Sequence, residues 1–212
     1  MRVQPPVIYD GLLQTSIGNR NFNQVDIMAL NASLQIRNVL KSSTNKSMLE
    51  IGGGSGTTAF WCNQIGLGPI QIFDLPHVAI LQAFYLLKVL PDANIVLYGE
   101  DQIVEQPDIT IFPHWALNEL PRISPALVFN QDSFAEMSTE VVQKYLRGIV
   151  DINATCLLSI NHESTATFNA SLTEQVNLSS LIKTELAFTS ISRYPNWVRL
   201  GYVDQLWELE RS

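Results

Sequence analysis

"MLEIGGGSGTTAFW", residues 48–61, sets four glycines within five positions, directly after a short apolar run and directly before a helical pattern. Glycine adopts unusual backbone angles and lets a ligand approach the main chain without a Cβ in the way. Between a strand and a helix N-terminus, such a turn presents free N–H groups at the carboxyl edge of a sheet. A tight connection without a ligand is the other interpretation, but Glu50 and Asp74 add two acidic residues that a mere turn does not require.

Strand and helix patterns alternate on both sides of this turn. Apolar runs predict strands at residues 47–52, 70–75, 94–99, 108–113, 126–134 and 155–160. Helical periodicity predicts helices at residues 25–43, 57–66, 77–90 and 138–152. Crossovers long enough to hold a helix indicate an α/β fold with a mostly parallel sheet and helices on both faces. Two β-rich runs around Gly201, with no helix between them, predict an antiparallel hairpin at one sheet edge.

The size and composition favour one domain. At 212 residues and 46% hydrophobic, the chain is long enough to bury a sizeable core. Residues 1–47 are expected to form an N-terminal arm and helix, in which Gly18 and Asn19 belong to a Pro-, Gly- and Asn-rich stretch. Residues 48–212 are expected to form the α/β domain itself.

The net charge and the cysteine content indicate which binding partners and which cell compartment to expect. The formal charge of −7 comes without any basic cluster, so nucleic acid is not an expected partner. Cys62 and Cys156 lie far apart and form no CxxC pair, which fits free thiols in a reducing cytoplasm. The apolar helix at 77–90 is too short to span a bilayer, and no signal-peptide pattern precedes it. We expect a cytoplasmic protein without a membrane segment. The sequence does not decide whether identical chains assemble into a homo-oligomer.

Two ligand classes fit the glycine turn. A nicotinamide or flavin dinucleotide prefers G-x-G-x-x-G/A, which Gly54, Gly56 and Ala59 satisfy, with Asp74 about twenty residues on. That frame is displaced, because Gly52 follows the strand at once and a dinucleotide has no obvious use for Glu50.

The other pattern is acid-x-Gly-x-Gly-x-Gly, and Glu50, Gly52, Gly54 and Gly56 meet it in full. Here the sequence resembles the class I S-adenosylmethionine-dependent methyltransferases, in which a second acid ends the next strand, as Asp74 does. The resemblance implies a Rossmann-like methyltransferase fold with S-adenosylmethionine as cofactor.

By that resemblance the glycine turn passes beneath the methionyl and ribose parts of the cofactor. Asp74 would bind both ribose hydroxyls, with Leu75 beside it, and Glu50 would help to hold the methionyl ammonium. Asp101, in "YGED", stands where an adenine-contacting acid is often found, although a solvated turn acid is equally consistent. Hydroxyl and ammonium donors suit carboxylates, and the cofactor has no phosphate to repel them.

A narrower resemblance covers roughly residues 48–165. "DLPHVAILQAFYL" at 74–86 and the segment with Asn130, Ser133, Glu136 and Met137 are similar to the sugar O-methyltransferase family. The resemblance implies O-methylation of a small hydroxylated acceptor, such as a sugar or a sugar-containing precursor. An NAD(P)-dependent oxidoreductase and a non-catalytic S-adenosylmethionine-binding protein remain as alternatives.

A sugar hydroxyl is a poor nucleophile while protonated, so a general base within hydrogen-bond reach would assist methyl transfer. His162 is the first candidate because "LLSINHES" places it just past a predicted strand. Asp132 and Glu136 follow the neighbouring strand and are its rivals.

The remaining candidates have structural interpretations of equal or greater weight. His114 is expected near the adenine or packed beside Trp115, and His77 at a helix start on the surface. No metal site is expected, because three ligands do not come together in the pattern. Four aromatic residues at helical spacing are expected in the core, namely Trp61, Phe84, Tyr85 and Tyr145.

Overall fold

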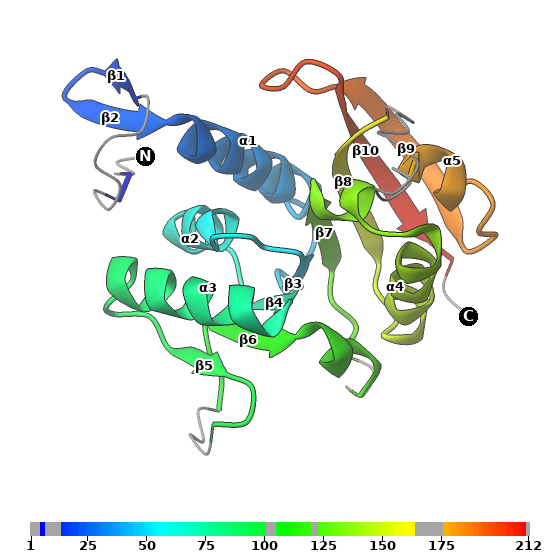
Figure 1. The fold of residues 1–212 in the computed structure, drawn as a ribbon, viewed down its shortest axis with the longest axis horizontal. Helices are drawn as coiled ribbons and strands as arrows, with labels where there is room; N and C mark the ends of the chain where they lie inside the picture. The colour runs from blue at the N-terminus through cyan, green and yellow to red at the C-terminus, as the bar shows by residue number, and fades with distance from the viewer. Residues whose placement is uncertain (1–4, 7–13, 101–104, 120–122, 164–175, 211–212) are drawn as a thin grey trace.

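The computed structural model describes residues 5–6, 14–100, 105–119, 123–163 and 176–210 (Figure 1). Its centre is an eight-stranded sheet in the order β5-β6-β4-β3-β7-β8-β10-β9. The strands are β3 (Met48–Ile51), β4 (Ile70–Asp74), β5 (Ile95–Leu97), β6 (Ile109–Pro113), β7 (Leu127–Gln131), β8 (Cys156–His162), β9 (Phe188–Pro195) and β10 (Tyr202–Leu209). Neighbours from β5 to β8 pair in parallel, whereas β10 pairs antiparallel with both β8 and β9. The mostly parallel sheet with an antiparallel C-terminal hairpin is confirmed.

Helices cover both faces of this sheet (Figure 1). The helices and 3₁₀ turns are α1 (Gln24–Val39), α2 (Thr57–Gln64), α3 (Pro76–Val89), η1 (His114–Asn118), η2 (Ser133–Glu136), α4 (Thr139–Asp151) and α5 (Leu178–Ile182). One hydrophobic cluster joins α1, α2 and α3 to the sheet, and a second joins η1, α4 and α5 to the other face. The helix of the N-terminal arm therefore packs into the same core as the glycine turn, while the division at residue 48 stays a prediction.

The helix starts follow local chemistry. Asn23 accepts a hydrogen bond from the Asp26 N–H at 2.8 Å, and the Asp26 carboxylate accepts one from the Asn23 N–H, which closes a capping box at α1. Ser138 caps α4, where its side-chain oxygen accepts a hydrogen bond from the Val141 N–H. Pro76 occupies the first turn of α3, where its missing N–H costs nothing.

The N-terminal stretch differs from the expected arm. Residues 14–23 form a separate hairpin, β1 (Gln14–Ile17) and β2 (Arg20–Asn23), with Gly18 at φ 63° in its turn. The β1 side chains are exposed, so the strand lacks the apolar alternation that a sequence pattern detects. The Gly-Asn pair is the signal that would have predicted this hairpin.

The aromatic residues separate into buried and exposed ones. Trp61 and Tyr85 are buried, and Tyr145 packs half-buried against the α4 cluster, as expected. Phe84 is 66% exposed, so its assignment to the core was wrong. Because α3 is apolar on every side, its periodicity does not indicate which face is inside.

Both cysteines are free thiols. Among the described helices, none has the length and apolar character that a membrane span requires.

Candidate functional site

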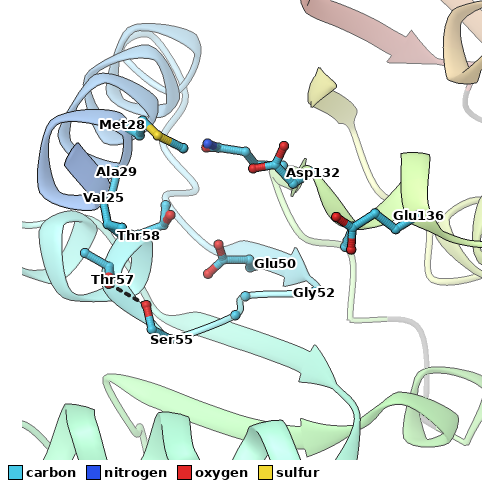
Figure 2. Close-up of a pocket in the computed structure, with 14 residues that line it drawn as sticks. Val25, Met28, Ala29, Glu50, Gly52, Ser55, Thr57, Thr58, Asp132 and Glu136 are labelled. Carbon is cyan, nitrogen blue, oxygen red and sulfur yellow. Dashed lines mark hydrogen bonds between the residues drawn. The ribbon is translucent and has the colours of Figure 1, made fainter. Parts of the chain in front are cut away.

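A cavity of about 330 Å³ lies where β3 and β7 end at the same edge of the sheet (Figure 2). Its volume is within the range of small-molecule sites. The described residues that line it are Val25, Met28, Ala29, Glu50, Gly52, Gly53, Gly54, Ser55, Thr57, Thr58, Gln131, Asp132, Ser133 and Glu136. Helix α1 and the glycine turn form one wall, and the segment after β7 forms the other (Figure 2).

The glycines of the turn serve different purposes. A Cβ on Gly52 would sit 2.1 Å from the Ser133 Oγ, and one on Gly53 would sit 2.7 Å from the Ile72 side chain. Gly52 also has φ +71°. Both positions are glycine because neighbouring protein atoms leave no room for a side chain.

Gly54 is the position open to the cavity. A Cβ there would meet no atom within 4 Å, although φ is +55°. Its N–H donates to the Asp74 carboxylate at 3.1 Å. The glycine that a ligand can approach is therefore fixed in place by the acid at the end of β4.

Asp74 supports the turn from behind. Its carboxylate also accepts hydrogen bonds from the Leu75 N–H at 2.7 Å and from the Gln82 amide at 2.7 Å. Burial raises the pKa of Asp74, and these hydrogen bonds oppose that shift. Asp74 is outside the described cavity lining, and Leu75 is half-exposed beside it. A carboxylate has about four acceptor sites, so three donors leave capacity for a further one.

Glu50 is the buried acid of the cavity. Its side chain is 2% exposed and points from β3 toward Thr58 (Figure 2). Burial, and then the nearby Asp74 charge, raise the pKa of Glu50 to about 8, against a hydrogen bond from Thr58. The Oε2 atom has no hydrogen-bond partner among the described residues. A buried acceptor without a donor is the arrangement that a cationic or N–H-bearing ligand would complete.

A buried amide network joins the ends of three strands. The Asn130 amide donates to the Ile51 carbonyl at 2.8 Å and to the Ser133 hydroxyl, while the Asn161 amide donates to the Asn130 oxygen at 2.9 Å. Asn130 and Asn161 are both buried. Two residues of the Asn-x-x-Ser motif thus hold β3, β7 and β8 in register at the cavity edge.

The far wall carries two carboxylates. Asp132 has φ +67° and forms an ion pair with Arg199, whose guanidinium also stacks on the Tyr202 ring at 3.6 Å from its centroid. The described residues give Glu136 no hydrogen bond or ion pair, and its side chain is exposed at the cavity rim. The Asp132 carboxylate is therefore held by a positively charged partner, whereas the Glu136 carboxylate is available to a ligand.

The tip of the β9–β10 hairpin positions Arg199. The Asn196 side-chain oxygen accepts hydrogen bonds from the N–H groups of Val198 at 2.9 Å and Arg199 at 2.8 Å. The Asn196 amide donates to the buried Asp204 at 2.6 Å. Gln35 of α1 donates to the same Asp204 carboxylate at 2.8 Å, so one acid connects the hairpin to the helix on the opposite wall.

His162 lies outside this cavity. It pairs with Tyr202 across the β8–β10 ladder, and the two rings meet edge to face at 5.7 Å. The described lining residues do not include His162. Its neighbour Tyr202 accepts a hydrogen bond from Arg199.

The other expected residues fall elsewhere or outside the described chain. Asp101 lies outside the described residues. His114 packs edge to face on Trp115 at 5.0 Å, and His77 is exposed at the start of α3. The described part of the chain holds no group of three His, Cys, Asp or Glu side chains placed for a metal ion.

Comparisons with known proteins identify the architecture. No protein-family model matches the sequence, and no curated protein matches it. Magnesium protoporphyrin IX methyltransferase from Synechocystis PCC 6803, solved with bound S-adenosylmethionine, superposes with a TM-score of 0.60 at 13% identity over 88% of this chain and 80% of that one. The mitomycin 7-O-methyltransferase MmcR gives 0.60 at 15% identity over 86% of this chain and 54% of that one.

The chain has the Rossmann-like methyltransferase fold. The same fold also includes a pericyclic reaction enzyme, with a TM-score of 0.56 at 13% identity over 82% of this chain and 47% of that one. The chain thus spans about half the length of two of these structures. The methyltransferase fold fixes where the cavity lies, and the reaction has to be argued from its side chains.

Sequence reasoning missed several residues of this methyltransferase-fold cavity. Val25, Met28 and Ala29 come from α1, which the glycine motif does not include. Arg199, on the hairpin, is not among the described lining residues, but it pairs with the lining residue Asp132 from 67 positions away. The basic residue just before the Gly201 turn was the one available signal, and it does not name the partner.

Proposed function

We propose that the chain is an S-adenosylmethionine-dependent O-methyltransferase that acts on a small hydroxylated acceptor, a sugar or a sugar-containing precursor. The observation that carries the proposal is Glu50, a buried carboxyl whose unpartnered Oε2 lies 3.2 Å from the position of a Cβ on Gly53, in the same cavity lining as the open glycine Gly54. Solved structures of this fold with bound S-adenosylmethionine support the choice of ligand.

The side chains present fit that cofactor. Glu50 would accept from its ammonium group, Gly54 would let it approach the main chain, and Asp74 would accept from its ribose hydroxyls beside Leu75. Val25 and Met28 offer apolar contact from α1. When bound, S-adenosylmethionine would supply a methyl group to the acceptor oxygen, with the carbon–sulfur bond broken as the carbon–oxygen bond forms and S-adenosylhomocysteine as the leaving group.

The far wall supports a hydroxylated acceptor. Gln131, Asp132 and Glu136 place amide and carboxylate oxygens along one side of the cavity, and hydroxyl groups donate to such acceptors. Because the Asp132 carboxylate is already engaged in an ion pair with Arg199, we assign proton abstraction to Glu136. Asp132 would then orient the acceptor, and His162 would support Tyr202 from behind.

The NAD(P)-dependent alternative has less support. A dinucleotide carries a pyrophosphate that binds free N–H groups of a glycine turn, and the Gly54 N–H already donates to the Asp74 carboxylate. A non-catalytic cofactor-binding protein would share every contact on the glycine side, so only turnover separates it from the proposed enzyme.

Calorimetry with S-adenosylmethionine, S-adenosylhomocysteine and NAD tests the ligand. Asp74→Ala should weaken binding of the sulfur ligands by about 1.5–3 kcal/mol, the usual scale for a hydrogen bond to a charged group. Gly54→Val should abolish binding, because the new side chain enters the open space. Gly66→Val is the matched control, since Gly66 has φ +76° and equally open space away from this cavity. Affinity for NAD alone would refute the proposal.

Turnover with a panel of sugar acceptors tests the base. Glu136→Gln should lower kcat by about 10²–10⁴ with cofactor affinity unchanged, since general bases contribute on that scale. Asp132→Asn and His162→Gln are the comparisons. A large loss in His162→Gln with wild-type turnover in Glu136→Gln would move the assignment to the histidine. Equal indifference in all three variants would mean that positioning suffices without a base.

A further inference from the structure

Helix α3 presents an apolar face that the described chain leaves uncovered. Four large side chains along it are 53–66% exposed, namely Ile80, Leu81, Phe84 and Leu87. The opposite face holds the buried residues Gln82, Ala83, Tyr85 and Leu86. A helix that is apolar on all sides is normally buried on all sides. The exposed face is therefore expected to have a partner.

A groove of about 400 Å³ runs along this face and ends at the glycine turn. The residues that line it are Gly54, Ser55, Val78, Leu81, Phe84, Tyr85 and Lys88. Gly54 and Ser55 also line the cavity described above, so whatever fills the groove lies against the back of the same turn.

We propose that this face binds a second copy of the chain, with α3 packed antiparallel on the partner's α3 about a two-fold axis near Phe84. The arrangement of apolar residues is self-complementary: Ile80 and Leu81 precede Phe84 by one turn, and Leu87 follows it by one turn. An antiparallel pair centred on Phe84 places the earlier turn of each helix on the later turn of the other. Leu81 of each helix then meets Leu87 of the other, and the two Phe84 rings meet at the axis. Ile80 lies beside the aliphatic stem of Lys88 of the other copy, so each off-axis contact occurs twice, as a two-fold axis requires.

Area favours a second copy, and the repulsion between two acidic chains is smallest at this face. The four side chains expose on the order of 500 Å² of apolar surface, so two faces that cover each other fully would bury up to about 1,000 Å², the lower threshold for a specific interface. The chain carries a net charge of −7, which opposes self-association through most of its surface. Lys88 is the only Lys, Arg, Asp or Glu between residues 76 and 89, and its ammonium lies over the Phe84 ring at 5.5 Å. Antiparallel packing sets the two lysines at opposite ends of the contact.

Sedimentation velocity over a range of concentrations tests the proposal. The wild type should sediment at twice its 23.7 kDa chain mass. Leu81→Glu and Phe84→Glu should each raise the dimer dissociation constant at least about tenfold, because a buried apolar contact is replaced by a charge. Leu186→Glu is the matched control, since Leu186 is 94% exposed in the turn before β9, away from α3. Circular dichroism confirms that each variant folds.

A short bis-maleimide gives a second readout that does not depend on loss of association. Phe84→Cys should cross-link two chains, because the two-fold axis brings the two positions together, while Leu186→Cys should not. Wild-type protein controls for Cys62 and Cys156. A monomeric wild type at every concentration would overturn the proposal, and so would a dimer that Leu186→Glu weakens and Leu81→Glu does not. Neither readout involves the cofactor or turnover, so the proposed function stands or falls separately.

Discussion

The two walls of the cavity are built in different ways. The wall around Glu50 and the glycine turn comes from consecutive residues, 50–58, with α1 laid over it. The opposite wall is the segment after β7, and its residue Asp132 forms an ion pair with Arg199, which comes from a hairpin far along the chain. The first wall is a local motif, whereas the second is an assembly that exists only when the sheet is complete. A substitution at a single residue should therefore have a large effect in the first wall. In the second wall the effect of each substitution should be smaller, because several residues contribute to the same structure.

The largest expected effect concerns Gly52. Gly52→Ala should lower the free energy of unfolding by about 3–5 kcal/mol, because its Cβ meets Ser133 and its φ is positive. Gly66→Ala, with a positive φ and open surroundings, should cost about 1 kcal/mol. Chemical denaturation measures both. Pairing Gly52→Ala with Ser133→Gly should recover at least about 1 kcal/mol through coupling. Strict additivity of the two substitutions would show that they do not clash.

Glu50 provides a pH-dependent test of the same wall. Its pKa in the folded protein is raised to about 8, so the folded state holds this proton more tightly than the unfolded state does. The resulting stabilisation is present below the ordinary pKa of 4.5 and is lost as pH rises toward 8. Glu50→Gln lacks this loss, and its stability relative to wild type should rise by about 2–4 kcal/mol between about pH 5 and 8. Parallel stability curves would show that Glu50 is ionised in the folded protein.

Asn130 tests the junction between the walls. Asn130→Ala should destabilise the fold by about 1–3 kcal/mol, because the Ile51 carbonyl and the Asn161 amide each lose a buried partner. Thermal unfolding measures the change. Gln131→Ala is the neighbouring control, since its side chain lines the cavity instead of joining the strands. An Asn130 variant as stable as the Gln131 variant would contradict this structural role.

The smallest stability effect is expected at Arg199. Its ion pair with Asp132 is partly exposed, so Arg199→Gln should change the unfolding free energy by less than about 1 kcal/mol. Turnover should change more than stability, because Asp132 would lose the guanidinium that holds its carboxylate in place beside the proposed acceptor. Arg193→Gln removes the Glu163 ion pair at the same sheet edge and serves as the control. Similar kinetics in both variants would show that Arg199 has no specific role in turnover.

The fold was readable from sequence where the determinants are local. The strand, glycine turn and helix of β3 and α2, and the acid ending β4, follow from adjacent residues. The reason for each glycine was not readable, because Gly52 and Gly53 are required by Ser133 and Ile72, which lie elsewhere in the chain. A glycine pattern alone therefore overstates how many of its positions face a ligand.

Two other outcomes depended on packing that the sequence pattern does not contain. Phe84 was expected in the core because α3 is apolar throughout, and only the packed structure shows which face is inside. Arg199 meets Asp132 because β10 lies beside β8 and antiparallel to it. Strand order of this kind arises from the whole sheet, so the contact between Arg199 and the far wall was beyond a residue-by-residue prediction.

The hydrogen bonds of Asn196 have a consequence for acceptor selectivity. Because Asn196 satisfies the N–H groups of Val198 and Arg199 and is itself anchored on Asp204, the hairpin tip acquires its shape as the protein folds. The conformational entropy of the tip is lost at that stage and not again on binding. Under the proposed function, this preset tip would hold Arg199 and its partner Asp132 in one position, so an acceptor stereoisomer with one misplaced hydroxyl would fit poorly against Asp132.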